Sequence, residues 1–282
     1  MRKVFLSLFT AFIFLVLPSC SAKTPLKNNF NAYLPPSFSS FAEIEEDLPI
    51  KTERAVDNTI WDLSDVDISY VDPNRKLISF TFDDGPSKTM ENILAVFTDY
   101  NERNPDCIAT ATFFLNGMHI SEDSLPLLHT ALVLGCELGN HTQRHHSLPT
   151  LTIEGAQAEI EETDTILARV DGKPLHLLRP PFGAIHEDLK TRLETPVINW
   201  TIDTLDWTGA SEVDIYNAVF NARFSGAIVL MHDGYPATVE ALKRLLPDLK
   251  KDGYQVVSVS AMAKAHGCTL RNGKEYIRAR KQ

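Results

Sequence analysis

Residues 78–86 read Ile-Ser-Phe-Thr-Phe-Asp-Asp-Gly-Pro, and the rest of the sequence is best interpreted from this stretch. Apolar residues alternate with polar ones and are followed by two acids and a Gly-Pro turn, which predicts a short β-strand. The strand would deliver the carboxylates of Asp83 and Asp84 to its C-terminal end. Successive side chains on a strand point in opposite directions, so we expect one carboxylate to bind a metal and the other, turned away, to act as a base. Taken alone, the stretch fits a solvated Asp-Asp-Gly turn equally well.

After residue 75, segments with strand character alternate with helical segments. The predicted strands are Leu77–Phe82, Ile108–Leu115, Cys136–Thr142, Leu175–Pro180, Val197–Ile202, Ala227–His232 and Tyr254–Val259. Helical patterns lie between them, for example Thr89–Asn104, Ile153–Val170, Glu212–Arg223 and Thr238–Lys251. This alternation predicts an α/β fold with a parallel sheet, open or closed into a barrel. Seven strands favour a distorted (β/α) barrel, in which chemistry takes place at the C-terminal ends of the strands.

Two histidines lie four residues apart after the third predicted strand, in Asn140-His141-Thr142-Gln143-Arg144-His145. If this segment turns helically, both imidazoles reach one metal ion. A carboxylate from another strand end would complete a set of three ligands with an open position, which is typical of catalytic zinc. The alternative is a pair of surface histidines.

The fourth predicted strand runs into Arg179-Pro180-Pro181-Phe182-Gly183. The prolines and the glycine restrict the backbone, so the Phe182 N–H is available to stabilise an oxyanion. The planar guanidinium of Arg179 is suited to holding a carboxylate in one orientation. A structural turn with a surface arginine explains the same residues.

The fifth predicted strand ends at Asp203-Thr204-Leu205-Asp206-Trp207, and the sixth ends at Leu230-Met231-His232-Asp233. A histidine at a strand end with an acid beside it is a candidate general acid, because the carboxylate favours the imidazolium and raises its pKa. Trp207 either walls a small pocket, stacks on a sugar or packs in the core.

Read in chain order, the strand ends TFDDG, HTQRH, RPPFG, DTLDW and LMH resemble the NodB-homology polysaccharide deacetylases. The resemblance extends over about residues 77–266, and residues 111–117 also resemble that family's second strand. It implies one divalent metal, zinc or another ion such as cobalt, bound by Asp84, His141 and His145.

The resemblance also implies a role for each remaining motif. Asp83 would deprotonate the attacking water, and Arg179 would tether Asp83. His232 would protonate the departing amine, with its pKa tuned by Asp206. The backbone N–H of Phe182 would help to hold the oxyanion. A tyrosine is common in the family at position 182, so a phenolic contact to the sugar is lost here.

The implied function is hydrolysis of N-acetyl groups on a polymer that contains GlcNAc, such as peptidoglycan, a chitin-like chain or poly-GlcNAc. Leu230 and Trp207 would line the slot for the acetyl methyl group. One alternative is an esterase for O-acetylated xylan, because an ester needs the same metal and oxyanion site. Another is a catalytically idle sugar-binding module, which is disfavoured because every catalytic position is filled.

The beginning of the sequence predicts export. Met1-Arg2-Lys3 precedes an apolar run from Val4 to Leu17, which is shorter than the ~20 residues of a membrane span and typical of a secretory signal. Leu17-Pro18-Ser19-Cys20 resembles a bacterial lipobox, so membrane association is expected only through a lipid on Cys20. Cleavage after Ala22 would instead release a soluble protein. We therefore expect the periplasm or the cell envelope as the location.

Composition supports this assignment and suggests four segments. The net charge of −10 over 282 residues argues against a nucleic-acid partner. We predict a signal peptide at 1–20, a tether and lead-in at 21–74, the deacetylase domain at 75–268 and a basic tail at 269–282. Trp61 and Tyr70 of the lead-in are expected to dock on the domain. Cys107, Cys136 and Cys268 show no C-x-x-C spacing, and their odd number leaves at least one thiol unpaired.

Overall fold

The computed structural model describes residues 59–280, and its central feature is a parallel sheet in the order β3-β2-β1-β6-β5, with β7 also pairing with β1. A second, two-stranded sheet joins β4 to β8. The strands are β1 (Lys76–Gly85), β2 (Thr112–Leu115), β3 (Glu137–Asn140), β4 (Val197–Ile198), β5 (Ile202–Asp203), β6 (Ile228–His232), β7 (Tyr254–Val256) and β8 (Glu275–Tyr276). The predicted α/β class with a parallel sheet is confirmed.

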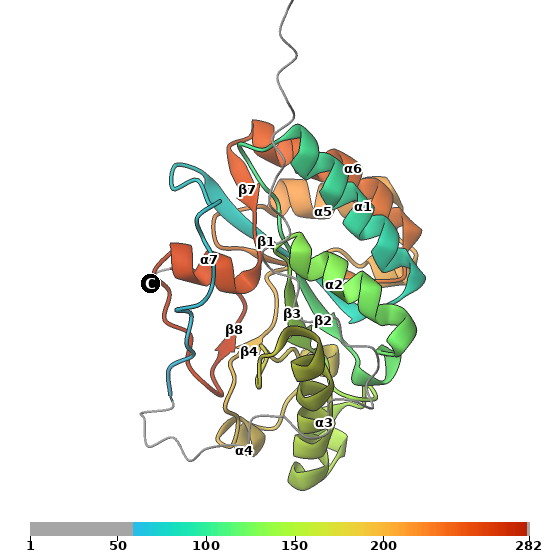
Figure 1. The fold of residues 1–282 in the computed structure, drawn as a ribbon, viewed down its shortest axis with the longest axis vertical. Coiled ribbons are helices and arrows are strands. Elements are labelled where there is room, and N and C mark those ends of the chain that lie inside the picture. The colour runs from blue at the N-terminus through green and yellow to red at the C-terminus, as the bar shows by residue number, and fades with distance from the viewer. Residues whose placement is uncertain (1–58, 281–282) are drawn as a thin grey trace, which may run out of the picture. The chain divides into compact units, whose positions relative to one another are not determined.

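Helices cover the outside of this sheet and follow the order of its strands. α5, α6, α1, α2 and α3 are neighbours in that sequence, just as β5, β6, β1, β2 and β3 are (Figure 1). The helices are α1 (Lys88–Arg103), α2 (Leu125–Val133), α3 (Ile153–Asp171), α4 (Glu187–Lys190), α5 (Glu212–Ala222), α6 (Pro236–Lys251) and α7 (Val259–Ala265). The four helical segments named from the sequence correspond to α1, α3, α5 and α6, with small differences at their ends.

Within residues 59–280 the main sheet does not close into a continuous barrel. Leu178 forms single parallel bridges to Asn140 at the end of β3 and to Val197 in β4, so it links the edge of the main sheet to the smaller one. The predicted strand Leu175–Pro180 is therefore reduced to isolated bridges. Proline lacks the N–H that a sheet ladder needs, and this predicted strand ends at Pro180 and is followed by Pro181. The fold is a barrel-like arrangement of parallel strands with an irregular side.

The predicted strand Val197–Ile202 is interrupted in the structure and appears as β4 and β5. The interruption coincides with the buried side chain of Arg179, whose Nε donates to the Ile198 carbonyl and whose Nη2 donates to the Asn199 carbonyl. These carbonyls are thereby occupied by a side chain. A buried guanidinium thus takes acceptors that a regular strand would offer to its neighbour.

β1 is buried on both faces, as expected for a central strand of a parallel sheet. Ile78, Phe80 and Phe82 are fully buried in the largest apolar cluster, and the Phe82 ring stacks on Phe113 with centroids 5.1 Å apart. On the alternate positions, Thr81 and Asp83 both accept hydrogen bonds from Arg179. The strand therefore carries Asp83 into a buried polar environment.

The folded unit is larger than the segment 75–268 predicted for the domain. Trp61 and Tyr70 pack against the apolar cluster that contains Leu77, and the Tyr70 hydroxyl lies 2.8 Å from Thr110 Oγ1. Residues 269–280 do not form a separate tail, since Glu275–Tyr276 pairs with β4 and Ala279 is buried. The basic residues of this segment suggested a solvated tail. The segment instead contacts residues that are distant in sequence, such as those of β4.

The predictions for the beginning of the chain concern other residues. The signal peptide, the lipobox cysteine Cys20 and most of the tether lie outside the described residues. No helix between residues 59 and 280 is long and apolar enough to cross a membrane. Cys107, Cys136 and Cys268 are all free thiols.

His176 is buried between two carboxylates of α3. Its Nδ1 lies 2.9 Å from Asp164 Oδ1, and its Nε2 lies 3.2 Å from Asp171 Oδ1. Carboxylates only accept hydrogen bonds, so both ring nitrogens must donate and the ring is an imidazolium. Burial lowers the pKa of His176, but the two hydrogen-bonded carboxylates raise it more, to about 9.

This cluster predicts a pH dependence of stability. We expect His176→Gln to lower the free energy of unfolding below about pH 6.5, the ordinary histidine pKa, and the difference from wild type to shrink as the pH rises through about 9. A histidine whose pKa is higher in the folded than in the unfolded state stabilises the protein fully at pH values below the unfolded pKa. This stabilisation is lost as the pH rises through the folded pKa. Urea unfolding across this range measures the difference. A constant difference would show that the charge of His176 contributes nothing.

Candidate active site

Three side chains converge at the C-terminal ends of β1 and β3. Asp84 Oδ1 lies 3.5 Å from His141 Nε2 and 3.3 Å from His145 Nε2. One ligand atom from each residue lies within 4.8 Å of the other two. The two strand ends are brought together because β2 pairs with β1 on one side and with β3 on the other. This is the set of ligands proposed from the sequence.

The backbone at Asp84 differs from the regular strand that the sequence predicted. The register between β1 and β2 shifts between Asp83 and Gly85, and Asp84 has φ of +71°. As a result Asp83 Oδ2 also lies 3.6 Å from His141 Nε2, so neither carboxylate is turned away. The expectation of opposite directions was wrong, because a bulge interrupts the alternation of side chains.

The loop that carries His141 and His145 is irregular and does not form the helical turn that would have brought two histidines four residues apart to one metal ion. β3 ends at Asn140, and the following residues are irregular, with φ of +68° at Thr142 and +57° at His145. These left-handed residues turn the loop so that the two imidazole centroids lie 4.9 Å apart. The ligands meet through loop geometry and not through helical spacing.

The donor set fits a cation. His141 Nδ1 lies 2.7 Å from the Arg179 carbonyl oxygen, which can only accept, so Nδ1 carries a hydrogen and Nε2 is the ring nitrogen that faces Asp84. Asp84 Oδ1 is buried and has no hydrogen-bond partner. Several acceptors that face one another without a donor between them are what a metal ion would satisfy.

Electrostatics favour the ligand forms of these side chains. Burial raises the pKa of the Asp84 carboxyl, but His141, His145 and His232 lower it more, so that it is about 2. Burial and the neighbouring His141 lower the pKa of His145 despite the nearby carboxylates. Asp84 is therefore ionised and His145 neutral near pH 7, which are the states that bind a divalent ion.

Asp83 is held on one side by a fully buried guanidinium. Arg179 Nη1 donates to Asp83 Oδ1 at 2.7 Å and to Thr81 Oγ1 at 2.6 Å. The guanidinium also lies over the Phe114 ring, 4.2 Å from its centroid. Because Oδ1 is engaged by Arg179, Oδ2 is the oxygen that faces the ligand cluster and is placed to accept a proton.

His232 stands at the end of β6, directly opposite Asp83 in the register of β1 and β6. Its Nδ1 lies 2.7 Å from Asp206 Oδ1, and its backbone N–H donates to Asp206 Oδ2 at 2.8 Å. Burial lowers the pKa of His232, but the Asp206 hydrogen bond and the nearby Asp83 raise it above its usual value. With Nδ1 directed at Asp206, Nε2 is left to exchange a proton.

The three residues predicted to bind substrate differ in exposure. Phe182, at φ of +61°, is 68% exposed, and its ring meets the His145 ring edge-on with centroids 4.8 Å apart. Trp207 is 53% exposed, which excludes the alternative that it packs in the core. Leu230 is buried within β6. Phe182 and Trp207 therefore offer aromatic surface beside the ligand cluster and beside Asp206.

Two further residues support the site, and the sequence assigned neither of them a role of its own. Asp233 accepts hydrogen bonds from the Ser87 backbone N–H and hydroxyl, and a Cβ at Gly85 would lie 2.8 Å from its Oδ2. Thr238 donates its hydroxyl to Asp206 Oδ2 at 2.7 Å. The position of Asp233 directly after His232 was the available signal. For Thr238, which lies on α6, the sequence offers none.

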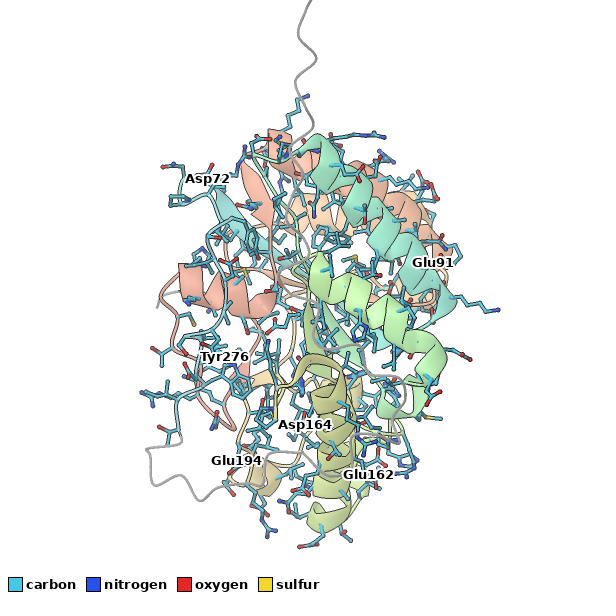
Figure 2. The ribbon with its side chains drawn as sticks, in the orientation of Figure 1. Asp72, Glu91, Glu162, Asp164, Glu194 and Tyr276 are labelled. Carbon is cyan, nitrogen blue, oxygen red and sulfur yellow. The ribbon has the colours of Figure 1, made fainter. Side chains whose placement is uncertain are left out.

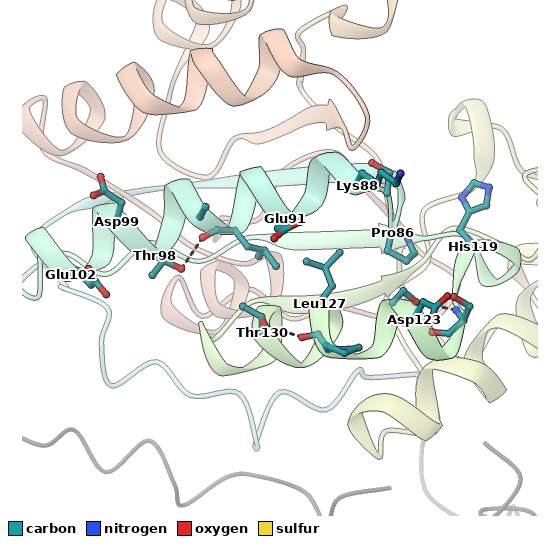
Figure 3. Close-up of a pocket in the computed structure, with 16 residues that line it drawn as sticks. Pro86, Lys88, Glu91, Thr98, Asp99, Glu102, His119, Asp123, Leu127 and Thr130 are labelled. Carbon is teal, nitrogen blue, oxygen red and sulfur yellow. Dashed lines mark hydrogen bonds between the residues drawn. The ribbon is translucent and has the colours of Figure 1, made fainter. Parts of the chain in front are cut away.

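A separate groove of about 960 Å³ runs between α1 and α2 (Figure 3). None of the ten candidate site residues lines it. It approaches the site at His119, whose Nδ1 lies 3.1 Å from the Asp84 carbonyl oxygen, and at Ser87, which bonds Asp233. The candidate residues thus lie at the strand ends and not along this groove.

Comparison with known proteins gives a consistent result. Residues 70–195 match the family model described as polysaccharide deacetylase. A peptidoglycan-N-acetylglucosamine deacetylase of Bacillus cereus is 35% identical over 67% of this chain and 89% of its own length. The peptidoglycan-N-acetylmuramic acid deacetylase PdaC of Bacillus subtilis is 33% identical over 68% of this chain, which spans 40% of that protein's length.

Solved structures show the same likeness. The structure of PdaC matches 69% of this chain and 93% of the solved chain with a TM-score of 0.63 and 33% identity. The Xyl-CE4 domain of a multidomain xylanase from the hindgut metagenome of Trinervitermes trinervoides matches 73% of this chain and 98% of its own, with a TM-score of 0.68 and 30% identity.

Proposed function

The chain belongs to the polysaccharide deacetylase family, and on that premise we propose that it removes N-acetyl groups from a GlcNAc-containing polysaccharide of the bacterial envelope. The observation that supports this proposal best is that Asp84, His141 and His145 converge between an acid–arginine pair and a histidine–acid pair. Asp83 with Arg179 stands beside these ligands, and His232 with Asp206 lies on the neighbouring strand. The cluster thus combines a divalent-metal site, zinc in our proposal, with a base and an acid.

Each group answers one difficulty of amide hydrolysis. When bound, the metal supplies polarisation of the acetyl carbonyl and a water acidic enough to attack near neutral pH. Asp83 Oδ2 takes the proton of the attacking water, while Arg179 keeps the other oxygen engaged. His232 gives a proton from Nε2 to the departing amine, and Asp206 holds the ring for this transfer. The exposed Phe182, beside His145, and the exposed Trp207, beside Asp206, would offer aromatic surface to the sugar.

An assay of acetate release tests the proposal. Zinc- or cobalt-loaded protein would be incubated with peptidoglycan, chitin oligomers, poly-β-1,6-GlcNAc and acetylxylan. We expect release from at least one N-acetylated polymer and none after chelation. The similarity to the xylanase-associated domain favours O-acetylated xylan as a second candidate substrate, and release from acetylxylan alone would favour it over the first. Release from no substrate, by protein that binds sugar, would instead support an idle binding module.

We expect His232→Ala to harm amide hydrolysis more than hydrolysis of an activated acetyl ester. A phenolate leaves without a proton, whereas an amine must be protonated to leave. The loss on an N-acetyl sugar should be about 10²–10⁴-fold, the usual effect of losing a positioned acid. Comparison of kcat/KM on both substrates measures the difference, and His129→Ala on α2 serves as the histidine control. An equal loss on both substrates would rule out His232 as the general acid.

The pH profile provides a related check on Asp206. Because Asp206 raises the pKa of His232, Asp206→Asn should lower that pKa and move the basic limb of kcat to lower pH. An unmoved basic limb would show that another group sets it.

For the beginning of the chain we propose export and lipidation at Cys20, which rests on the sequence pattern of residues 17–21. The wild-type protein should then fractionate with membranes, and Cys20→Ser should be released or remain unprocessed. Fractionation of bacteria that produce each form, with the mature N-terminus determined by mass spectrometry, measures this. A soluble wild-type protein whose first residue lies beyond Cys20 would contradict the lipid anchor.

A further inference from the structure

The buried face of α3 carries polar residues where apolar ones would fill the core. Glu159, Thr163 and Asp164 are all buried, although the helix also buries Ile160 and Leu167. Asp164 is marked on this helix in Figure 2. Burying a carboxylate is costly unless its hydrogen bonds are made, so the partners of these residues indicate what they do. Their partners lie mainly in the loop that carries His141 and His145.

Glu159 binds the middle of this loop through its carboxylate and its backbone. Its Oε2 accepts the Arg144 backbone N–H at 2.7 Å, and its Oε1 accepts Arg144 Nη1 at 3.0 Å. Its carbonyl oxygen accepts the Gln143 N–H at 2.9 Å. Thr163 adds a hydroxyl bond to Gln143 Oε1 at 3.3 Å. The two residues directly before His145 are therefore attached to α3.

Asp164 acts on the start of the loop through Asn140. Asn140 Nδ2 donates to Asp164 Oδ1 at 2.9 Å and to the Ile160 carbonyl, which orients the amide. Its Oδ1 is then directed to the Thr142 N–H, 2.8 Å away. This bond holds Thr142 in the left-handed conformation that a β-branched residue rarely adopts. The strained residue lies directly after His141.

His176 keeps the side-chain amide of Asn140 from turning over. The imidazolium donates to the same Asp164 Oδ1 that accepts from Asn140, and it donates to Asp171 from its other nitrogen. Asp164 Oδ1 is the acceptor in both contacts, so Asn140 presents its NH₂ to α3 and its oxygen to Thr142. The charge on His176 thus favours the one amide orientation that supports the loop.

We propose that Glu159 and Asp164 are positioning residues that hold His141 and His145 at the spacing needed for metal binding, with His176 holding Asp164 through the same oxygen that accepts from Asn140. The inference rests on the proposed metal site and goes beyond it, because neither carboxylate is among the ligands. Groups that orient metal ligands typically contribute about 10–100-fold to metal affinity.

The test measures metal affinity and not turnover. Zn²⁺ would be titrated into metal-free protein in competition with a chromophoric chelator, and the visible spectrum of the Co²⁺ form would report ligand geometry. We expect Glu159→Ala and Asp164→Asn each to weaken binding about 10–100-fold and to alter the Co²⁺ bands. Glu159→Gln should recover part of the loss, because an amide oxygen still accepts the Arg144 N–H.

Glu137→Ala is the matched control. Glu137 lies at the opposite end of β3, and its carboxylate accepts hydrogen bonds from Thr112 Oγ1 and from the Ser260 backbone N–H and hydroxyl. Its loss should lower stability in urea without changing metal affinity. If the folded Glu159→Ala and Asp164→Asn proteins had wild-type affinity and spectra, this inference would be overturned but the proposed function would stand. A wild-type protein that binds neither Zn²⁺ nor Co²⁺ would overturn the proposed function as well.

Discussion

Replacement of His141 by alanine is expected to abolish both metal binding and turnover. His141 Nε2 lies 3.5 Å from Asp84 Oδ1, and its other nitrogen is held by the Arg179 carbonyl, so the ring has one orientation and one free lone pair. Its loss leaves only two of the three ligands. Without the ion the attacking water would keep a pKa near the bulk value of about 15.7 in place of roughly 7. No side chain in the site offers an equivalent substitute for that effect.

Two measurements check this result. Metal content by mass spectrometry and acetate release should fall together in His141→Ala, and added zinc or cobalt should restore neither at concentrations that saturate the wild type. His129→Ala is a suitable control, because His129 lies on α2 and is not one of the three ligands. Full activity of a metal-free His141→Ala sample would refute the assignment of this residue as a ligand.

Asp83→Asn is expected to retain the metal and to lose about 10²–10⁴-fold in turnover, the usual range for a positioned base. Asparagine keeps the shape of the side chain, and its oxygen can still accept from Arg179 Nη1. The negative charge that accepts the water's proton is removed. The buried Arg179 charge also loses its partner, and breaking a buried pair in this way costs about 3–5 kcal/mol of stability.

Because stability and turnover both change, the two must be measured separately. Turnover should be compared at a temperature where urea titration shows Asp83→Asn to be fully folded, with metal content determined on the same sample. Asp99→Asn on α1 provides an exposed control for the same chemical change. A folded, metal-loaded Asp83→Asn protein with turnover within a few-fold of wild type would mean that the base is elsewhere.

The sequence by itself was sufficient to predict the class of fold and to propose site residues that the structure brings together. Alternation of strand and helix patterns predicted the parallel sheet, because periodicity is a local property that burial imposes on every element. The site residues follow individual strands, and parallel strands bring their C-terminal ends to one edge, so Asp84, His141 and His232 could be expected near one another. Neither step required knowledge of a specific contact between distant residues.

The tertiary structure decided how these residues face each other. The bulge at Asp84 turns both carboxylates of β1 toward His141, and the left-handed Thr142 and His145 curl a loop that the spacing had suggested to be helical. Arg179 enters the sheet and divides a predicted strand, while residues 269–280 join the fold through β8. Each of these features depends on a hydrogen bond or a strand pairing between residues distant in sequence. Local patterns carry no record of such partners, because the same residue is compatible with several conformations until the packed fold supplies one acceptor or donor.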